Sequence, residues 1–336
     1  MSRPTFRLAI LATAGLLAST LAACGTDTAS GSSPSSAEPA SAGSFPRTLD
    51  NCGRSVTIAA APKRIVLVNN DAVANLEALD AIDRVVGVTA PLQPELYEPE
   101  TYERLGDLTM LSSKTNSTGG SIVSQESLLA ADPDLVIAPA NAVDIGGLEA
   151  AGIAVYVPTA FCTDPGAELS RRATFDRVWD DLGDYATLLS VEPLRQTVEA
   201  TAKARVADID APDRGTAAAL YVSSGGSVLS PYGAPSMVTP VFEAAGLDNV
   251  YADQDERVFD VNLEDLVDRD PRTIVLLYSD DPEGTRDAFL SVPGVDALSA
   301  VKSGRVVTLP FPYTDPASVL STRGPEALTK ALDDLE

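Results

Sequence analysis

Short apolar runs and amphipathic stretches alternate along most of the chain. The apolar runs are continuous and rich in β-branched residues, at 64–68, 84–88, 135–138, 152–157, 217–222 and 273–277. Such runs predict strands that are buried on both faces. In between, apolar side chains recur every three or four residues, as from Val73 to Ile82, which predicts helices. This alternation is typical of an α/β fold with mostly parallel sheets covered on both faces.

One order of elements occurs twice in the sequence. Residues 126–133, a helical segment that ends in Asp-Pro, match residues 264–271, and an apolar strand follows each copy. The tripeptide Leu76-Glu77-Ala78 is likewise echoed by Phe242-Glu243-Ala244. We therefore expect two lobes built on one plan, each a doubly wound and mostly parallel sheet.

Two helical patterns lie between the repeated halves. The first is an apolar stripe from Phe175 to Leu189 that contains Trp179, which we expect in the core rather than against a ligand. The second begins at Pro193, suited to a first helical turn, and runs to Ile209. At 1.5 Å per residue it would span about 25 Å, enough to bridge two lobes. The expected division is an N-terminal lobe at 46–190, an inter-lobe helix at 191–210 and a C-terminal lobe at 211–336.

The first 45 residues read as a signal and a tether. Arg3 and Arg7 precede an apolar run, and the chain then reads Leu-Ala-Ala up to Cys24. This pattern predicts a secretory signal peptide at 1–23, and its ending resembles a bacterial lipobox, in which the cysteine is lipidated. Residues 24–45, rich in Ser, Ala and Pro, then form a flexible tether. We expect the protein on the extracytoplasmic face of the cell membrane, in contact with it only through the lipid on Cys24.

Composition excludes several kinds of chemistry. The 336 residues include 48 acidic and 24 basic side chains, and the net charge of −24 disfavours binding to nucleic acid or anionic lipid. There is no histidine, which excludes Ser-His-Asp catalysis, imidazole zinc sites and histidine-ligated haem. We expect no catalytic residue and no metal site, although an enzyme that uses a pair of carboxylates for catalysis stays an alternative. With Cys24 lipidated, Cys52 and Cys162 remain in an oxidising compartment, and we expect them to pair.

The chain resembles the cluster-3 (class III) solute-binding lipoproteins of ABC importers, which serve ferric siderophores, haem and vitamin B12. The segments that carry the resemblance are 51–53, 62–66, 83–88, 132–137, 233–236 and 243–250. The expected pair Cys52 and Cys162 resembles the cysteine pair of the actinobacterial FecB-like branch, which serves iron-siderophore uptake.

The resemblance implies a monomer of two lobes, joined by one long helix, that binds its ligand in the cleft between them. It implies capture of a ferric siderophore and delivery to an ABC permease with its ATPase subunits, with no cofactor besides the lipid. Cobalamin or haem binding by the same fold stays an alternative, as does a sensor or scaffold lipoprotein without transport. Family members dock on permease arginines through a glutamate in each lobe. The N-lobe position falls on Ala74 here, so we expect Glu77, one turn later, and Glu243 to take that role.

Ligand contacts are expected in the loops beyond the carboxyl ends of the strands. The aromatic and amide candidates there are Asn69, Asn70, Tyr97, Tyr102, Asn141, Phe161, Tyr232, Tyr278, Phe311 and Tyr313. Arg257 and Arg323 are the first candidates to meet negative charge or ligand oxygens, and Lys114 is the next candidate. Because these loops hold few basic residues, a neutral or weakly charged hydroxamate or mixed chelate fits better than a tricatecholate.

Overall fold

The computed structural model describes residues 45–116, 119–164, 166–222 and 228–335. The described residues belong to one compact unit. The predicted signal peptide, the lipidation site Cys24 and the tether up to residue 44 lie outside the described residues.

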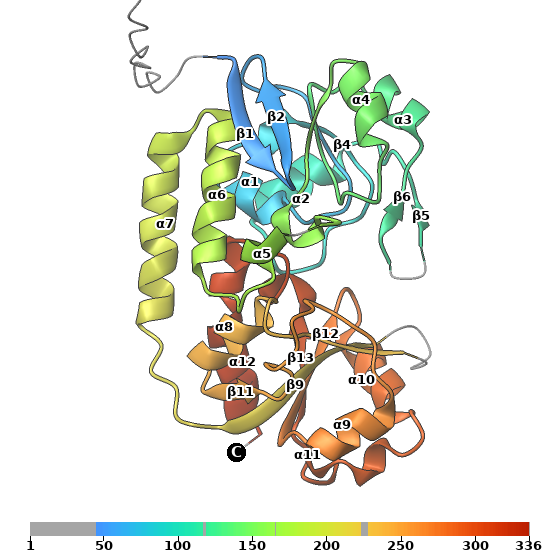
Figure 1. The fold of residues 1–336 in the computed structure, drawn as a ribbon, viewed down its shortest axis with the longest axis vertical. Helices are drawn as coiled ribbons and strands as arrows, with labels where there is room; N and C mark the ends of the chain where they lie inside the picture. The colour runs from blue at the N-terminus through green and yellow to red at the C-terminus, as the bar shows by residue number, and fades with distance from the viewer. Residues whose placement is uncertain (1–44, 117–118, 165, 223–227, 336) are drawn as a thin grey trace, which may run out of the picture. The chain divides into compact units, whose positions relative to one another are not determined.

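The N-terminal lobe is built on a four-stranded parallel sheet (Figure 1). Its strand order is β4-β3-β7-β8, with β3 at Ile65–Leu67, β4 at Val85–Val88, β7 at Leu135–Ile137 and β8 at Ala154–Tyr156. The helices are α1 (Val73–Ala78), α2 (Pro99–Gly106), α3 (Gln125–Ala130) and α4 (Ile145–Ala150). Leu76 of α1 packs in the core on one face, whereas Leu128 and Leu148 of α3 and α4 pack with alternate strand residues on the other. Both faces of the sheet are therefore covered, as the apolar strands predict.

The C-terminal lobe repeats this plan around the long strand β9 (Gly215–Val222). Its other strands are β10 (Leu229–Pro231), β11 (Leu247–Asn249), β12 (Thr273–Tyr278) and β13 (Val306–Pro310). β11 and β12 flank β9 in parallel and β13 follows β12, which matches the order of the first sheet, while β10 pairs with β9 antiparallel.

Helices cover both faces of the second sheet as well. α8 (Val238–Ala244) and α12 (Gly324–Asp333) pack on one face, and α9 (Leu263–Arg269), α10 (Pro282–Leu290) and α11 (Ser299–Lys302) on the other. The predicted fold class, two doubly wound and mostly parallel lobes, is confirmed.

Two adjacent helices connect the lobes. α6 (Asp176–Leu189) buries Leu182 and Tyr185 in the N-terminal core, and α7 (Glu192–Ala207) packs beside α6 (Figure 1). Trp179 lies in the core as expected, in a cluster that also contains Met237 of the second lobe.

The remaining elements are short. A hairpin of β1 (Arg47–Asn51) and β2 (Arg54–Ile58) turns at Cys52 and Gly53, both with positive φ, and Cys52 forms the predicted disulfide with Cys162. A second hairpin pairs β5 (Lys114–Thr115) with β6 (Ser121–Ile122), and α5 spans Gly166–Leu169. The 3-10 turns are η1 (Ile82–Arg84), η2 (Thr159–Phe161), η3 (Val295–Ala297), η4 (Phe311–Tyr313) and η5 (Val319–Thr322).

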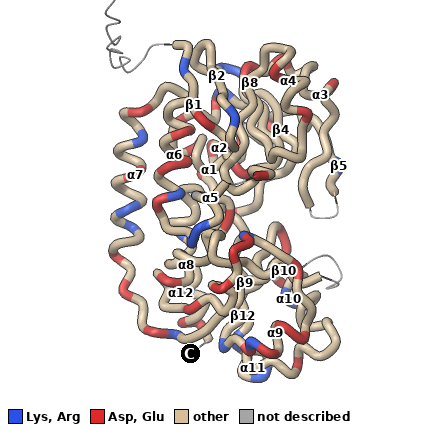
Figure 2. Tube along the Cα trace, viewed as in Figure 1, with Lys and Arg blue, Asp and Glu red and all other residues tan. Residues whose placement is uncertain are grey.

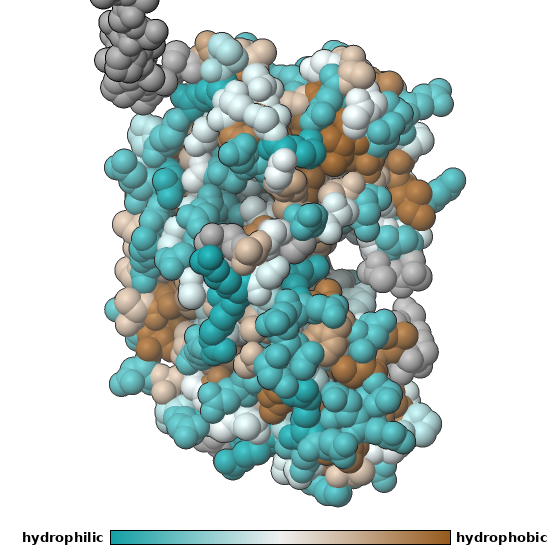
Figure 3. All heavy atoms as spheres, viewed as in Figure 1, coloured by the Kyte–Doolittle hydropathy of each residue, from teal (hydrophilic) through white to brown (hydrophobic). Residues whose placement is uncertain are grey.

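Acidic and basic side chains are mixed over the surface. Figure 2 shows acidic residues in both lobes, and basic residues interspersed with them along α7. Most of the face shown in Figure 3 is polar. None of the helices in the described ranges has the length and apolar character needed to span a bilayer.

Candidate functional site

The two lobes meet through loops that follow their strands. The guanidinium carbon of Arg257, in the C-terminal lobe, lies 5.4 Å from the ring centroid of Phe161 in η2 of the N-terminal lobe. Gln93 Nε2 donates to the carbonyl oxygen of Tyr278 at 3.3 Å. Figure 3 shows the surface hollowed between the lobes, on the side away from α7. The carboxyl ends of the parallel strands therefore face a shared cleft, where ligands of open α/β sheets bind.

Charged groups from both lobes form the centre of this cleft. Arg257 Nη1 donates to Oδ2 of Asp315, whose side chain is only 2% exposed. Asp71 of the other lobe lies within electrostatic reach of Arg257. Burial raises the pKa of Asp71 from 3.8 to about 7, while a hydrogen bond from Asn69 and the charge of Arg257 oppose the rise. The guanidinium of Arg257 thus pairs with one carboxyl group and lies within electrostatic reach of a second, while its side chain stays 24% exposed.

The turn after β3 positions Asp71. Asn69 adopts φ +67°, a left-handed conformation that asparagine tolerates better than most residues. Its backbone N–H donates to Thr89 Oγ1 at 3.0 Å, and its Oδ1 accepts from the backbone N–H of Ser121 at 2.8 Å. The polar groups of Asn69 are therefore occupied in holding the turn and orienting the carboxyl of Asp71.

Aromatic side chains line the C-terminal side of the cleft. The Phe311 ring centroid lies 6.3 Å from that of Tyr232 and 6.3 Å from that of Tyr221. Tyr232 is buried, and burial raises its pKa above the ordinary value for a phenol. Burial likewise raises the pKa of Tyr278 and Tyr313, so all three hydroxyls stay protonated near neutral pH.

The loop between β4 and α2 supplies Tyr97, and the first turn of α2 supplies Tyr102; their ring centroids are 5.8 Å apart. The Tyr102 hydroxyl donates to the carbonyl of Gln93 and accepts from the backbone N–H of Leu96 at 2.9 Å, so it fixes this loop internally. Burial and the nearby charge of Asp71 raise the pKa of Tyr97. Tyr97 is thus the loop's aromatic neighbour of the charged centre.

Three other predicted contact residues have different surroundings. Asn141, after β7, and Lys114, in β5, are exposed. Arg323 donates to the carbonyl of Leu96 at 3.4 Å and lines a cavity of about 200 Å³ between α7 and η5. Their roles in ligand binding stay predictions.

The two glutamates expected to dock a permease occupy equivalent helices, α1 and α8. Glu77 Oε1 accepts from the backbone N–H of Glu98 at 2.9 Å, which ties α1 to the start of α2. Glu243 forms an ion pair with Arg172, and both side chains are about half exposed. Their docking role stays a prediction.

The sequence reasoning did not select three residues that the structure places in the cleft. Asp71 and Gln93 follow β3 and β4, and Asp315 follows β13. The polar turn directly after a buried strand was the available signal for Asp71. The pairing of Asp315 with Arg257, 58 residues away, carried no local signal.

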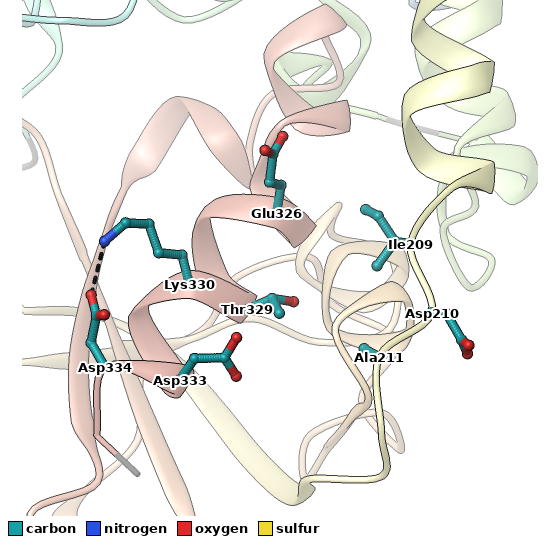
Figure 4. A pocket seen from close by; sticks show the side chains of 8 residues that line it. All are labelled: Ile209, Asp210, Ala211, Glu326, Thr329, Lys330, Asp333 and Asp334. Carbon is teal, nitrogen blue, oxygen red and sulfur yellow. Dashed lines mark hydrogen bonds and ion pairs between the residues drawn. The ribbon is translucent and has the colours of Figure 1, made fainter.

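A larger cavity of about 530 Å³ lies elsewhere, between α12 and the chain that follows α7 (Figure 4). Glu326, Lys330, Asp333 and Asp334 contribute exposed charged side chains to it, and Lys330 Nζ pairs with Asp334 Oδ2 at 2.9 Å. None of the predicted ligand residues lines this cavity.

Comparison with known proteins gives consistent matches. The family model for periplasmic binding proteins matches residues 65–313. An ABC-type Fe3+-hydroxamate transport system structure from Saccharomonospora viridis is 37% identical, with a TM-score of 0.80, over 86% of this chain and 99% of the other. No protein with a curated description matches significantly.

More distant structures share the fold. A periplasmic haem-binding protein of Pseudomonas aeruginosa is 21% identical, with a TM-score of 0.61, over 81% of this chain and 92% of the other. A periplasmic vitamin B12-binding protein of Vibrio cholerae is 17% identical, with a TM-score of 0.53, over 82% and 98%. The family model covers well over half of the chain, so this protein belongs to the periplasmic binding protein family, whose members are extracytoplasmic solute-binding proteins of ABC transport and not enzymes.

Proposed function

We propose that this protein captures a ferric hydroxamate siderophore in the cleft between its lobes and hands it to an ABC permease. The observation that carries the proposal is the 37% identity, over nearly the whole of the other chain, with an Fe3+-hydroxamate transport protein. The iron would arrive already chelated, as cargo. This identity supports the iron-siderophore branch that the sequence suggested.

Arg257 is the residue best placed to hold the chelate. A guanidinium has five N–H donors, and the pairing with Asp315 that the structure records uses Nη1. Because the side chain is 24% exposed, donors remain for the oxygens of an iron-bound hydroxamate. Phe161 lies against the guanidinium and, with Phe311, which packs on the buried Tyr232, would offer apolar surface to the linkers of the chelate.

The tyrosines of the cleft favour a siderophore over haem. In a chain without histidine, tyrosine is one side chain that can bind haem iron, and it binds as its anion. Burial raises the pKa of Tyr97, Tyr232, Tyr278 and Tyr313, which opposes formation of that anion. A neutral phenol instead donates a hydrogen bond to a chelate oxygen.

Membrane attachment and docking complete the proposal. Lipid on Cys24 would hold the protein at the extracytoplasmic face, with the residues up to 44 as its tether. Glu77 and Glu243, on equivalent helices of the two lobes, would meet basic residues of the permease, which acts with its ATPase subunits.

Calorimetric titration of the mature chain carrying Cys24→Ala tests the ligand class. The panel would hold ferric hydroxamate, catecholate and mixed siderophores, haem and cobalamin. We expect micromolar or tighter binding of a ferric hydroxamate and no comparable binding of its iron-free form. Selective binding of haem or cobalamin would replace the proposed ligand, and no binding at all would favour a sensor or scaffold role.

A further inference from the structure

Three buried side-chain oxygens on the N-terminal wall of the cleft have no hydrogen-bond partner among the described residues. They are Oδ1 of Asn70, Oδ2 of Asp71 and Oε1 of Gln93. The amide groups of Asn70 and Gln93 are oriented by their nitrogens, which donate to the carbonyls of Pro91 and of Tyr278 and Ser279. All three unpartnered atoms are therefore acceptors.

The three acceptors lie on adjoining turns. Asn70 and Asp71 follow β3, Gln93 follows the neighbouring parallel strand β4, and the bond from Asn70 to Pro91 ties the two turns together. Gln93 also touches the opposite lobe through its amide nitrogen. Another unpartnered atom nearby, Asn75 Nδ2, belongs to a side chain that binds Val319 at the contact of α1 with η5. Buried acceptors without donors are costly, so their gathering on one wall indicates a surface built to receive donors.

The charge of the site points in the same direction. Arg257 is a cation within electrostatic reach of Asp71, and it is already paired with Asp315. When Asp71 is ionised, these three groups comprise two carboxylates and one guanidinium, and together they carry a net negative charge. This suits a cationic donor and repels a multiply charged anionic chelate.

We propose that this wall binds a positively charged, hydrogen-bond-donating group of the ligand, with Asp71 as its counter-ion and the amide oxygens of Asn70 and Gln93 as further acceptors. The inference rests on the proposed function and specifies its substrate. Three hydroxamates neutralise Fe3+, so the chelate itself has no net charge. A pendant ammonium group then gives the ligand class expected here, a ferric trihydroxamate of charge +1.

Two ferric ligands that share one chelate test the inference in the wild-type protein. Ferrioxamine B, a linear trihydroxamate, carries a terminal ammonium, and its N-acetyl derivative is neutral. We expect calorimetry on the mature Cys24→Ala chain to show about 10- to 100-fold tighter binding of the ammonium form, the range of a charged hydrogen bond. The comparison needs no variant of the site.

The variant Asp71→Asn keeps the shape of the side chain and removes its charge. We expect it to lose the preference for the ammonium form while binding the acetylated form about as well as the wild type. Asp181→Asn is the matched control, because Asp181 is also buried with an unpartnered oxygen but lies on α6, and it should keep the preference.

The outcomes separate the two proposals. Equal affinity of the wild type for both ligands, or a preference that survives Asp71→Asn, would overturn this inference and leave the proposed function standing. Failure of every ferric hydroxamate to bind would instead overturn the proposed function.

Discussion

Asp181 shows how burial acts on a single side chain away from the cleft centre. It is 1% exposed, accepts a hydrogen bond from Thr159 Oγ1 at 2.7 Å, and has no partner for Oδ2 among the described residues. Burial raises its pKa from 3.8 to about 7, with Asp184 and Asp180 adding to the rise and Thr159 and Arg177 opposing it. Its carboxyl is therefore half protonated near neutral pH, where an unfolded chain would have it ionised.

This shift predicts a pH dependence of stability. Since the folded pKa lies above the unfolded value of 3.8, folding takes up a proton between about pH 4 and pH 7, and the free energy of unfolding falls as pH rises through that window. Between pH 5 and pH 8 the share of Asp181 is about 2–3 kcal/mol. In urea unfolding, the free energy of unfolding of Asp181→Asn should therefore fall by about 2–3 kcal/mol less than that of the wild type between pH 5 and pH 8. An unchanged pH dependence would contradict the shift.

Arg257 and Asp315 form an ion pair, and we expect the effect of replacing one on stability to depend on the other. Arg257→Gln leaves the buried carboxylate of Asp315 without its cation, so we expect a loss of about 3 kcal/mol in the free energy of unfolding. Adding Asp315→Asn should recover most of that loss, because it removes the unpaired charge. Urea unfolding of the two single variants and the double variant measures the coupling; additive losses would show that the pair is not coupled.

At the scale of elements, the hydrophobic pattern predicted what burial decides. Each buried apolar run forms a strand of one of the two sheets, because a continuous apolar strand is shielded from water on both faces when helices cover both sides of the sheet. The boundaries were less predictable. The helix expected from Val73 to Ile82 ends at Ala78, since Asp80 takes φ +52° and the chain tightens into η1.

A disulfide links the turn of the β1–β2 hairpin to the segment after β8. Cys52 and Cys162 have their Cα atoms 5.3 Å apart and lie 110 residues apart in sequence. Closing a loop of that length stabilises a fold by about 4–5 kcal/mol in the chain-entropy model. Replacing both cysteines by serine should lower the free energy of unfolding by up to this amount. Thiol labelling of the folded Cys24→Ala chain should find no free thiol, and two reactive thiols would refute the pairing.

At the scale of the whole molecule, the internal repeat predicted two lobes of one topology, and the strand orders β4-β3-β7-β8 and β11-β9-β12-β13 agree. The candidate site was harder to predict. Strand ends pointed to loops in which Arg257, Tyr232 and Phe161 lie near one another, and their role in ligand binding stays a prediction. The structure leaves one oxygen of Asp71 without a partner among the described residues. Such a result depends on contacts between distant segments, which a local sequence pattern does not contain.

The proposed docking role involves one glutamate from each lobe. Charge reversal at Glu77 and Glu243 should abolish uptake of the chelate while leaving its affinity for the isolated protein unchanged. Because Glu77 also accepts the backbone N–H of Glu98, Glu77→Gln serves as a control that keeps an acceptor at this place. Uptake of labelled iron by cells carrying each variant is the readout, and normal uptake by the doubly reversed protein would reject the docking role.

The central claim, that a ferric hydroxamate binds in the cleft at Arg257, is tested most directly by the affinity of the Arg257→Gln, Asp315→Asn double variant. Calorimetry should show micromolar or tighter binding of a ferric trihydroxamate to the wild type, and at least about tenfold weaker binding to the double variant, because the charge-assisted bonds to the chelate are lost. Equal affinity of the two proteins, with the double variant as stable as the wild type, would place the ligand elsewhere.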